Sequence, residues 1–89
     1  MTNKDVAEGF LNGLALSTNS FHSTVDGRLF SYSTCIAQFW DNKLIGNSTK
    51  YSVTTSKHLN YIKNKIHLWT SPNKPVPIGT RDLIPYLDL

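Results

Sequence analysis

The sequence predicts a small α+β domain, in which an antiparallel sheet of about three to four strands is flanked by an N-terminal helix and a central to C-terminal helix. Apolar residues recur at helical spacing near the start of the chain and again after residue 58, and strand-forming residues interrupted by turn pairs lie between these two stretches. The 89 residues are 39% hydrophobic and 17% charged, which is the composition of one globular domain with a modest core. We find no internal repeat and no second domain.

The first helix is expected over residues 2–16. Thr2 or Asn3 can cap it, and its apolar residues recur at helical spacing at Val6, Phe10 and Leu14. An interior glycine costs about 1 kcal/mol relative to alanine. Gly13 is therefore either a weak point of this helix or its end.

The strands are expected between residues 20 and 53. The segment 20–25 is β-like, and Asp26-Gly27 predicts a hairpin turn because both residue types tolerate positive φ. A long strand over residues 28–40 carries apolar side chains of both parities, so that either both of its faces are partly covered or a bulge near Ser33-Thr34 switches them. Asp41-Asn42 predicts a second turn, followed by a short strand over 43–45 and an extended piece to about residue 53.

The second helix is expected to begin at Thr54 or Thr55 and to run to residue 66 or 68. Its inward face would consist of Leu59, Ile62 and Ile66. The prolines that follow favour an extended path, so residues 70–89 are predicted to form a Pro-rich tail that packs on the domain or on a partner.

The composition bounds the cellular context. The single cysteine, Cys35, excludes an intramolecular disulfide framework and suits a reducing cytoplasm. No apolar stretch approaches the length of a membrane span, and the N-terminus lacks the apolar core of a signal peptide, so we expect a cytoplasmic protein without a membrane partner. The three histidines and one cysteine do not follow zinc-ligand spacing, and neither a metal nor a cofactor is predicted.

The charge is distributed unevenly. The net charge is +3, but the span 43–81 holds no carboxylate and seven basic residues: Lys43, Lys50, Lys57, Lys63, Lys65, Lys74 and Arg81. Such a span predicts a basic face, with Lys43, Lys63 and Lys65 as members, that meets phosphate or an acidic protein surface. The alternative is that the lysines only solvate a helix and its neighbouring loops.

The hydroxyl-rich segment 47–58 contains the candidate binding site. Helix N-termini have unpaired backbone N–H groups and a partial positive charge, and hydroxyls and lysines here would add to both. The candidate residues for an anion, a phosphate or a partner are Lys50, Tyr51, Thr54, Thr55, Ser56, Lys57 and His58. The favoured alternative is that these hydroxyls serve only to start a helix.

Aromatic residues are interleaved with the basic ones. Tyr51, Tyr61 and Trp69 lie among the lysines, which loosely fits backbone-level contact with nucleic acid or a nucleotide, although no nucleic-acid module signature is present. Trp40 and Trp69 are expected to lie in the core, with one or two aromatics left as interface anchors. No catalytic spacing is found, so an enzyme is not predicted, and the minor alternative is a small enzyme using Cys35 and a histidine.

Two runs carry a family resemblance. Leu29-Phe-Ser-Tyr-Ser-Thr-Cys-Ile-Ala37 and Lys50-Tyr-Ser-Val-Thr-Thr-Ser-Lys-His58 resemble an uncharacterised family of small bacteriophage and mobile-element proteins, over about residues 20–63. The family has no assigned activity, so the resemblance implies no functional residue.

The resemblance implies a context and a class of function. We expect a non-enzymatic bacteriophage accessory protein that acts by binding in the cytoplasm of a host bacterial cell. It would be a counter-defence inhibitor, anti-CRISPR-like or nucleotide-sequestering, whose partner is a host protein or nucleoprotein complex. The alternative is a module that binds nucleic acid or a phosphate-bearing nucleotide for phage replication or regulation. A homodimer is left open.

Overall fold

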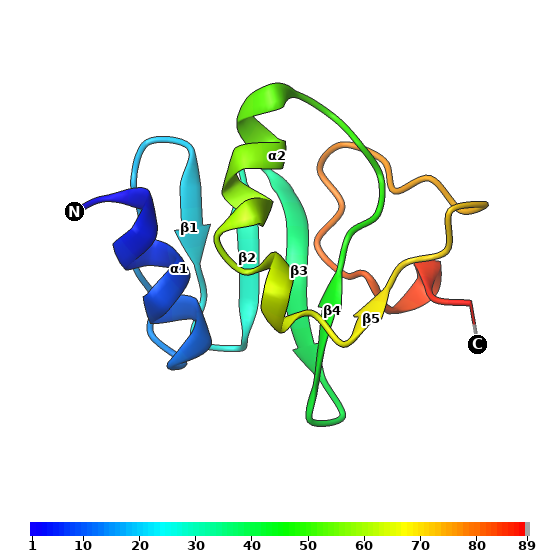
Figure 1. Ribbon diagram of the computed structural model, residues 1–89, viewed down its shortest axis with the longest axis horizontal. Helices are drawn as coiled ribbons and strands as arrows, with labels where there is room; N and C mark the ends of the chain where they lie inside the picture. Colours follow the sequence, from blue (N-terminus) through cyan, green and yellow to red (C-terminus); the bar gives the residue numbers. More distant parts are fainter. Residues whose placement is uncertain (89) are drawn as a thin grey trace.

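The structure is a computed structural model that describes residues 1–88, and Figure 1 shows its elements along the chain. Two α-helices, α1 and α2, accompany five strands, β1 to β5, and two short 3₁₀ helices, η1 and η2, in these residues. In chain order they are α1 (Asn3–Leu11), β1 (Phe21–Ser23), β2 (Arg28–Ser31), β3 (Thr34–Trp40), β4 (Lys43–Gly46), α2 (Val53–Asn60), η1 (Lys63–Lys65), β5 (Leu68–Trp69) and η2 (Ile84–Tyr86).

The strands form one mixed sheet in the order β1-β2-β3-β4-β5. The first four are an antiparallel meander, and β5 then pairs parallel to β4, with Ile45 opposite Leu68. The predicted α+β class is confirmed, with one strand more than expected. The strand β5 was not anticipated because two residues are too few to show a strand pattern.

The predicted single strand over residues 28–40 is wrong. The chain turns at Tyr32-Ser33, so that Ser31 pairs with Thr34 and two antiparallel strands, β2 and β3, replace one. The hairpin was missed because its turn has neither Gly nor Asn, and Tyr32 takes the required positive φ of 55°. The irregularity in the ladder lies between Leu29 and Phe30, rather than near Ser33-Thr34.

The other two predicted turns are confirmed. Gly27 takes a φ of 81° between β1 and β2, and Asp41 and Asn42 take φ values of 51° and 61° between β3 and β4. Two consecutive residues with positive φ match the right-handed twist of the strands they join. Asn and Asp tolerate this conformation better than most residues.

The helix α1 is shorter than predicted. It begins after Thr2, whose hydroxyl accepts the Asp5 backbone N–H while the Asp5 carboxylate accepts the Thr2 N–H, which makes a capping box. It ends at Leu11, and Gly13 takes a φ of 77° just beyond, which makes this glycine the end of the helix rather than an interior weak point.

The helix α2 also differs from its predicted bounds. Its N-cap is Ser52, whose hydroxyl accepts the Thr55 N–H, so Thr54 and Thr55 both lie inside the helix. It ends at Asn60, and η1 follows after a turn, because residues 53–60 are rich in Thr, Ser and Asn, which favour helices weakly. The expected inward residues Leu59, Ile62 and Ile66 nevertheless pack on the core.

The sheet has a core cluster on each face. The helices α1 and α2 cover one face, where the buried residues are Val6, Ala7, Phe10, Phe21, Leu29, Ile36, Ala37, Leu44 and Ile62. The C-terminal tail covers the other, where the buried residues are Phe30, Cys35, Ile45, Val76, Leu83 and Leu87. Neighbours such as Leu29 and Phe30 belong to different clusters because successive side chains of a strand point to opposite faces. The tail thus packs on the sheet and covers its second face.

Among residues 1–88, no helix has both the length and the apolar character needed to cross a membrane.

Candidate functional site

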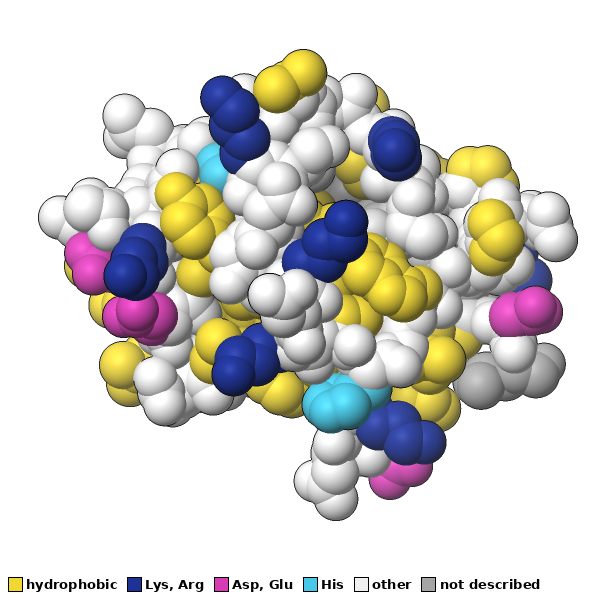
Figure 2. All heavy atoms as spheres, viewed as in Figure 1, with side chains coloured by type: hydrophobic (Ala, Val, Ile, Leu, Met, Phe, Trp, Pro, Cys, Tyr) yellow, Lys and Arg dark blue, Asp and Glu magenta, His cyan; other side chains and the backbone are white. Residues whose placement is uncertain are grey.

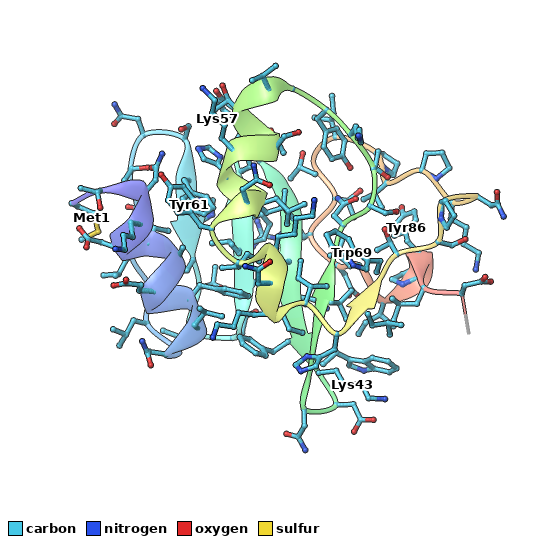
Figure 3. The ribbon with its side chains drawn as sticks, in the orientation of Figure 1. Met1, Lys43, Lys57, Tyr61, Trp69 and Tyr86 are labelled. Carbon is cyan, nitrogen blue, oxygen red and sulfur yellow. The ribbon has the colours of Figure 1, made fainter. Side chains whose placement is uncertain are left out.

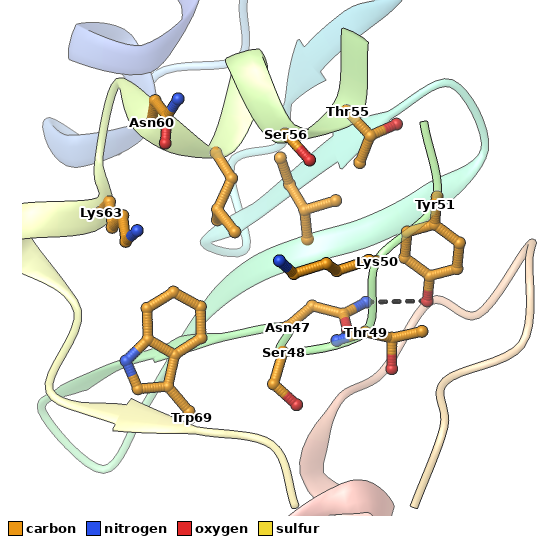
Figure 4. Close-up of a pocket in the computed structure, with 12 residues that line it drawn as sticks. Asn47, Ser48, Thr49, Lys50, Tyr51, Thr55, Ser56, Asn60, Lys63 and Trp69 are labelled. Atoms are coloured by element: carbon orange, nitrogen blue, oxygen red, sulfur yellow. Dashed lines mark hydrogen bonds between the residues drawn. The ribbon is translucent and has the colours of Figure 1, made fainter. Parts of the chain in front are cut away.

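A pocket of about 200 Å³ lies between α2, the loop that joins β4 to α2, and β5. Figure 4 shows this pocket with its lining side chains. The floor is apolar and the rim is polar and basic, and the lining residues are Ile36, Asn47, Ser48, Thr49, Lys50, Tyr51, Thr55, Ser56, Leu59, Asn60, Lys63 and Trp69.

Asn47 holds the loop 47–51 against the sheet. Its buried side-chain amide donates to the Cys35 carbonyl oxygen at 3.0 Å and to the Tyr51 hydroxyl at 3.1 Å. Its carbonyl oxygen Oδ1 accepts the Thr49 backbone N–H at 2.9 Å. One buried amide therefore fixes both the loop backbone and the Tyr51 ring on one side of the pocket, since buried polar groups with all partners in place are rigid.

Residues that follow β5 also hydrogen-bond to the loop 47–51. The Ser48 hydroxyl donates to the Thr70 carbonyl oxygen at 2.8 Å, and the Thr70 hydroxyl accepts the Ser48 N–H at 2.9 Å. The Thr49 hydroxyl accepts the Val76 N–H at 2.9 Å, and the Tyr51 hydroxyl donates to the Val76 carbonyl oxygen. Burial raises the pKa of Tyr51, so this hydroxyl stays protonated and remains a donor. The pocket wall is preformed.

Trp69 forms the opposite wall. Its indole is 37% exposed, so the ring is partly free to contact another molecule. Gly46 allows this position, because a Cβ there would come within 2.9 Å of the Trp69 atom Cζ3 and 2.5 Å of the Ile66 atom Cδ1. The glycine thus lets the indole lie against β4. Trp69 is not the core residue that the sequence predicts.

Two lysines reach over the pocket. Figure 4 shows Lys50 extending from the loop across the pocket in the direction of Lys63 and the indole of Trp69. Among residues 1–88 the only ion pair joins Arg28 to Asp26 at 3.5 Å, so neither lysine has a carboxylate partner there.

The centre of this face also lacks acidic side chains. Figure 2 shows lysine side chains spread over α2, η1 and the tip that joins β3 to β4, with acidic side chains only at the margins. Lys57 and Lys43 lie toward opposite ends of this surface in Figure 3. We call the surface formed by five exposed lysines the lysine face, and these lysines are Lys43, Lys50, Lys57, Lys63 and Lys65.

The predicted site residues separate into four groups. Lys50, Tyr51, Thr55 and Ser56 line the pocket, together with Lys63 from the predicted basic face. Thr54 lines a neighbouring hollow with Tyr32 and Ile78, and the remaining candidates lie away from both hollows: Lys57 is exposed on α2, Lys43 begins β4, and Lys65 lies on η1. His58 is in the core.

His58 belongs to a buried hydrogen-bonded chain that sequence reasoning missed. Its side chain is 1% exposed, its Nδ1 lies 2.7 Å from the Ser31 hydroxyl, and its ring stacks on Phe21 at 4.3 Å between centroids. The Ser31 hydroxyl also lies 3.0 Å from that of Thr55. The other ring nitrogen, Nε2, is buried without a hydrogen-bond partner among the described residues. Burial lowers the pKa of His58, because the site disfavours the charged form of the ring.

The geometry disfavours nucleophilic chemistry at Cys35. The thiol is buried, donates to the Ala37 carbonyl oxygen, and has its pKa raised to about 12 by burial. A protonated thiol is a poor nucleophile and a poor metal ligand. No group of three His, Cys, Asp or Glu side chains within residues 1–88 could hold a metal ion.

Comparison with known proteins gives a family without a function. Residues 8–73 match the profile of a family of unknown function, DUF8033. No curated protein and no solved structure matches the chain at a significant level. The matched span contains the loop 47–51, α2, η1 and β5, and therefore the whole lining of the pocket.

Proposed function

We propose that this chain, which belongs to DUF8033, a family of unknown function, binds the phosphate backbone of nucleic acid with its lysine face. The absence of carboxylates from the span 43–81 carries this proposal. Lysines that only solvate a surface usually alternate with acidic residues, whereas a surface that carries positive charges alone attracts a polyanion.

The spread of the lysines favours a chain of phosphates over a single phosphate. Lys50 and Lys63 flank one pocket, while Lys57 and Lys43 extend the positive surface to either side of it (Figure 3). A small anion would be held by cations that converge on one point. An extended positive surface instead follows a backbone, which carries charge at regular intervals.

Salt dependence tests this proposal. We expect a fluorescently labelled oligonucleotide to bind at low salt and to be released as salt rises, with the logarithm of the affinity falling linearly with the logarithm of the salt concentration. Each phosphate that the protein no longer neutralises makes this slope shallower by roughly 0.7 to 0.9. Lys50→Ala and Lys63→Ala should each reduce the slope by about that amount, whereas Lys4→Ala on α1 should not.

Two results would overturn the proposal. One is no binding of any oligonucleotide at low salt. The other is an equal reduction of affinity and slope in Lys50→Ala and Lys4→Ala, because only the first residue lies on the lysine face. Circular dichroism of each variant establishes that the fold is intact.

A second proposal follows from the resemblance to bacteriophage proteins: an accessory factor that blocks a host protein in the bacterial cytoplasm. An apolar surface beside the pocket supports it. Tyr32 and Ile78 are 56% and 79% exposed and line one hollow together with Lys50 and Thr54. Exposed apolar groups gathered beside polar ones are typical of surfaces that another protein covers.

Affinity capture from a host lysate tests the second proposal. A specific partner should be retained by the wild type and lost by Tyr32→Ser/Ile78→Ser. Leu14→Ser is the matched control, because Leu14 is another exposed apolar residue in a loop away from the hollow. A capture pattern that is the same for all three proteins would exclude this surface as the partner site.

A further inference from the structure

We infer that the pocket beside Trp69 takes one unpaired nucleobase, so that the nucleic acid bound by the lysine face is single-stranded. This inference rests on the proposed function and names its ligand class more narrowly. It comes from the shape and chemistry of the pocket, whereas the proposal of nucleic-acid binding comes from charge.

The pocket has the chemistry of a base site. Ile36 and Leu59 supply apolar lining and Trp69 an aromatic ring, while Ser56 and Asn60 add a hydroxyl and an amide to the lining. A nucleobase likewise has flat faces that stack on aromatic rings, and polar edges that accept and donate hydrogen bonds.

The size of the pocket limits what enters it. Its volume of about 200 Å³ is below the roughly 300 to 1,000 Å³ of pockets that enclose a drug-sized ligand. One ring system therefore fits, and the sugar and phosphate attached to it stay outside, where Lys50 and Lys63 extend. A base in a duplex has both faces covered by its neighbours, so only an unstacked base can reach the indole.

Both walls of the pocket are held in place before any ligand binds. Gly46 leaves room for Trp69 to lie against β4, and Asn47, Thr70 and Val76 hold the loop on the other side through hydrogen bonds. A preformed site loses little conformational entropy on binding. Stacking on an aromatic side chain tolerates different bases, so we expect weak dependence on sequence.

Binding of single-stranded and duplex oligonucleotides of the same sequence, at equal salt, tests the inference. The wild type should prefer the single strand, and Trp69→Leu should lose about tenfold to a hundredfold in single-strand affinity, with duplex affinity and the salt slope unchanged. Trp69→Phe keeps a ring and should recover most of the loss. Urea unfolding of each variant checks that the fold is retained.

A measurement on the wild type tests the stacking without any substitution. Tryptophan emission should be quenched by the single strand but not by the duplex. The free mononucleotide should bind much more weakly than the strand, because it reaches fewer lysines; equal affinity would overturn the assignment to a strand.

Backbone binding and the base pocket can be refuted separately. If the lysine variants lose affinity while Trp69→Leu and the quenching signal show no difference between single strand and duplex, the base pocket is wrong and backbone binding stands. If no nucleic acid binds at low salt, both fall.

Discussion

The buried His58 makes the stability of the fold sensitive to mild acid. Its side chain is 1% exposed, and burial lowers its pKa, so the folded protein keeps the ring neutral below the pH at which the unfolded chain binds a proton. As the pH drops, the free energy of unfolding falls wherever the unfolded state binds more protons than the folded state. The stabilising difference is therefore intact above the unfolded pKa of about 6.5 and is lost as the pH drops below it.

The size of the loss follows from the geometry. Protonation would place a positive charge on a ring that is 1% exposed and whose Nε2 has no hydrogen-bond partner among residues 1–88. A histidine that stays neutral while the unfolded chain titrates costs at most about 1.4 kcal/mol per pH unit. Between pH 7.5 and 5.5 we therefore expect His58 to lower the free energy of unfolding by no more than about 1.4 kcal/mol.

Urea unfolding followed by tryptophan fluorescence at these two pH values measures the loss. His58→Leu should remove the part due to His58 and shift stability at pH 7.5 by less than about 1.5 kcal/mol, because it deletes an unpartnered polar atom but also the stacking on Phe21. His22 also has a pKa lowered by burial and by Arg81, so His22→Gln is measured beside it. Equal pH-dependent losses in wild type and His58→Leu would refute the reasoning.

Three further predictions concern other positions. Gly46→Ala should lower the free energy of unfolding by about 1 to 3 kcal/mol, measured in urea, because the added Cβ would lie 2.5 Å from Ile66 and 2.9 Å from Trp69. The same crowding should shift the tryptophan emission, and an unchanged spectrum would contradict this contact. Tyr32→Asn should raise the urea midpoint by the equivalent of about 0.5 to 1 kcal/mol, since Asn adopts the positive φ of 55° at lower cost; a lower midpoint would show that the tyrosine ring contributes more than the turn. Cys35 should react with a thiol reagent at pH 8 only in denaturant, because burial raises its pKa to about 12, and rapid labelling of the folded protein would refute its inert role.

The fold could be predicted where local chemistry decides it. Asp26-Gly27 and Asp41-Asn42 have residues suited to positive φ, and Gly13 ends α1 for the same reason. The turn at Tyr32 could not be found, because a residue that disfavours positive φ is held there by the pairing of β2 with β3. Pairing of this kind depends on residues distant in sequence, which no local pattern contains.

The candidate site was located in part. The segment 47–58 does line the pocket with Lys50, Tyr51, Thr55 and Ser56, because these residues lie in the loop and first turn that start α2. His58 follows them in sequence but turns to the core, since a helix rotates each residue by about 100° and only part of a run shares one face. The sequence predicts Trp69 to be a core residue. Its position at the surface depends on Gly46, the residue opposite it on β4, because a side chain there would collide with the indole.

The hydrogen bonds that join the loop 47–51 to the tail also set an order on folding. Hairpins close the meander β1–β4 through contacts between near neighbours in sequence, whereas the bonds from Thr49 to Val76 and from Ser48 to Thr70 span 27 and 22 residues. Contacts close in sequence generally form first, so we expect the tail to dock last. The loop 47–51 then lacks these bonds in a form whose tail is undocked, and a ligand that prefers the braced pocket stabilises the completed structure.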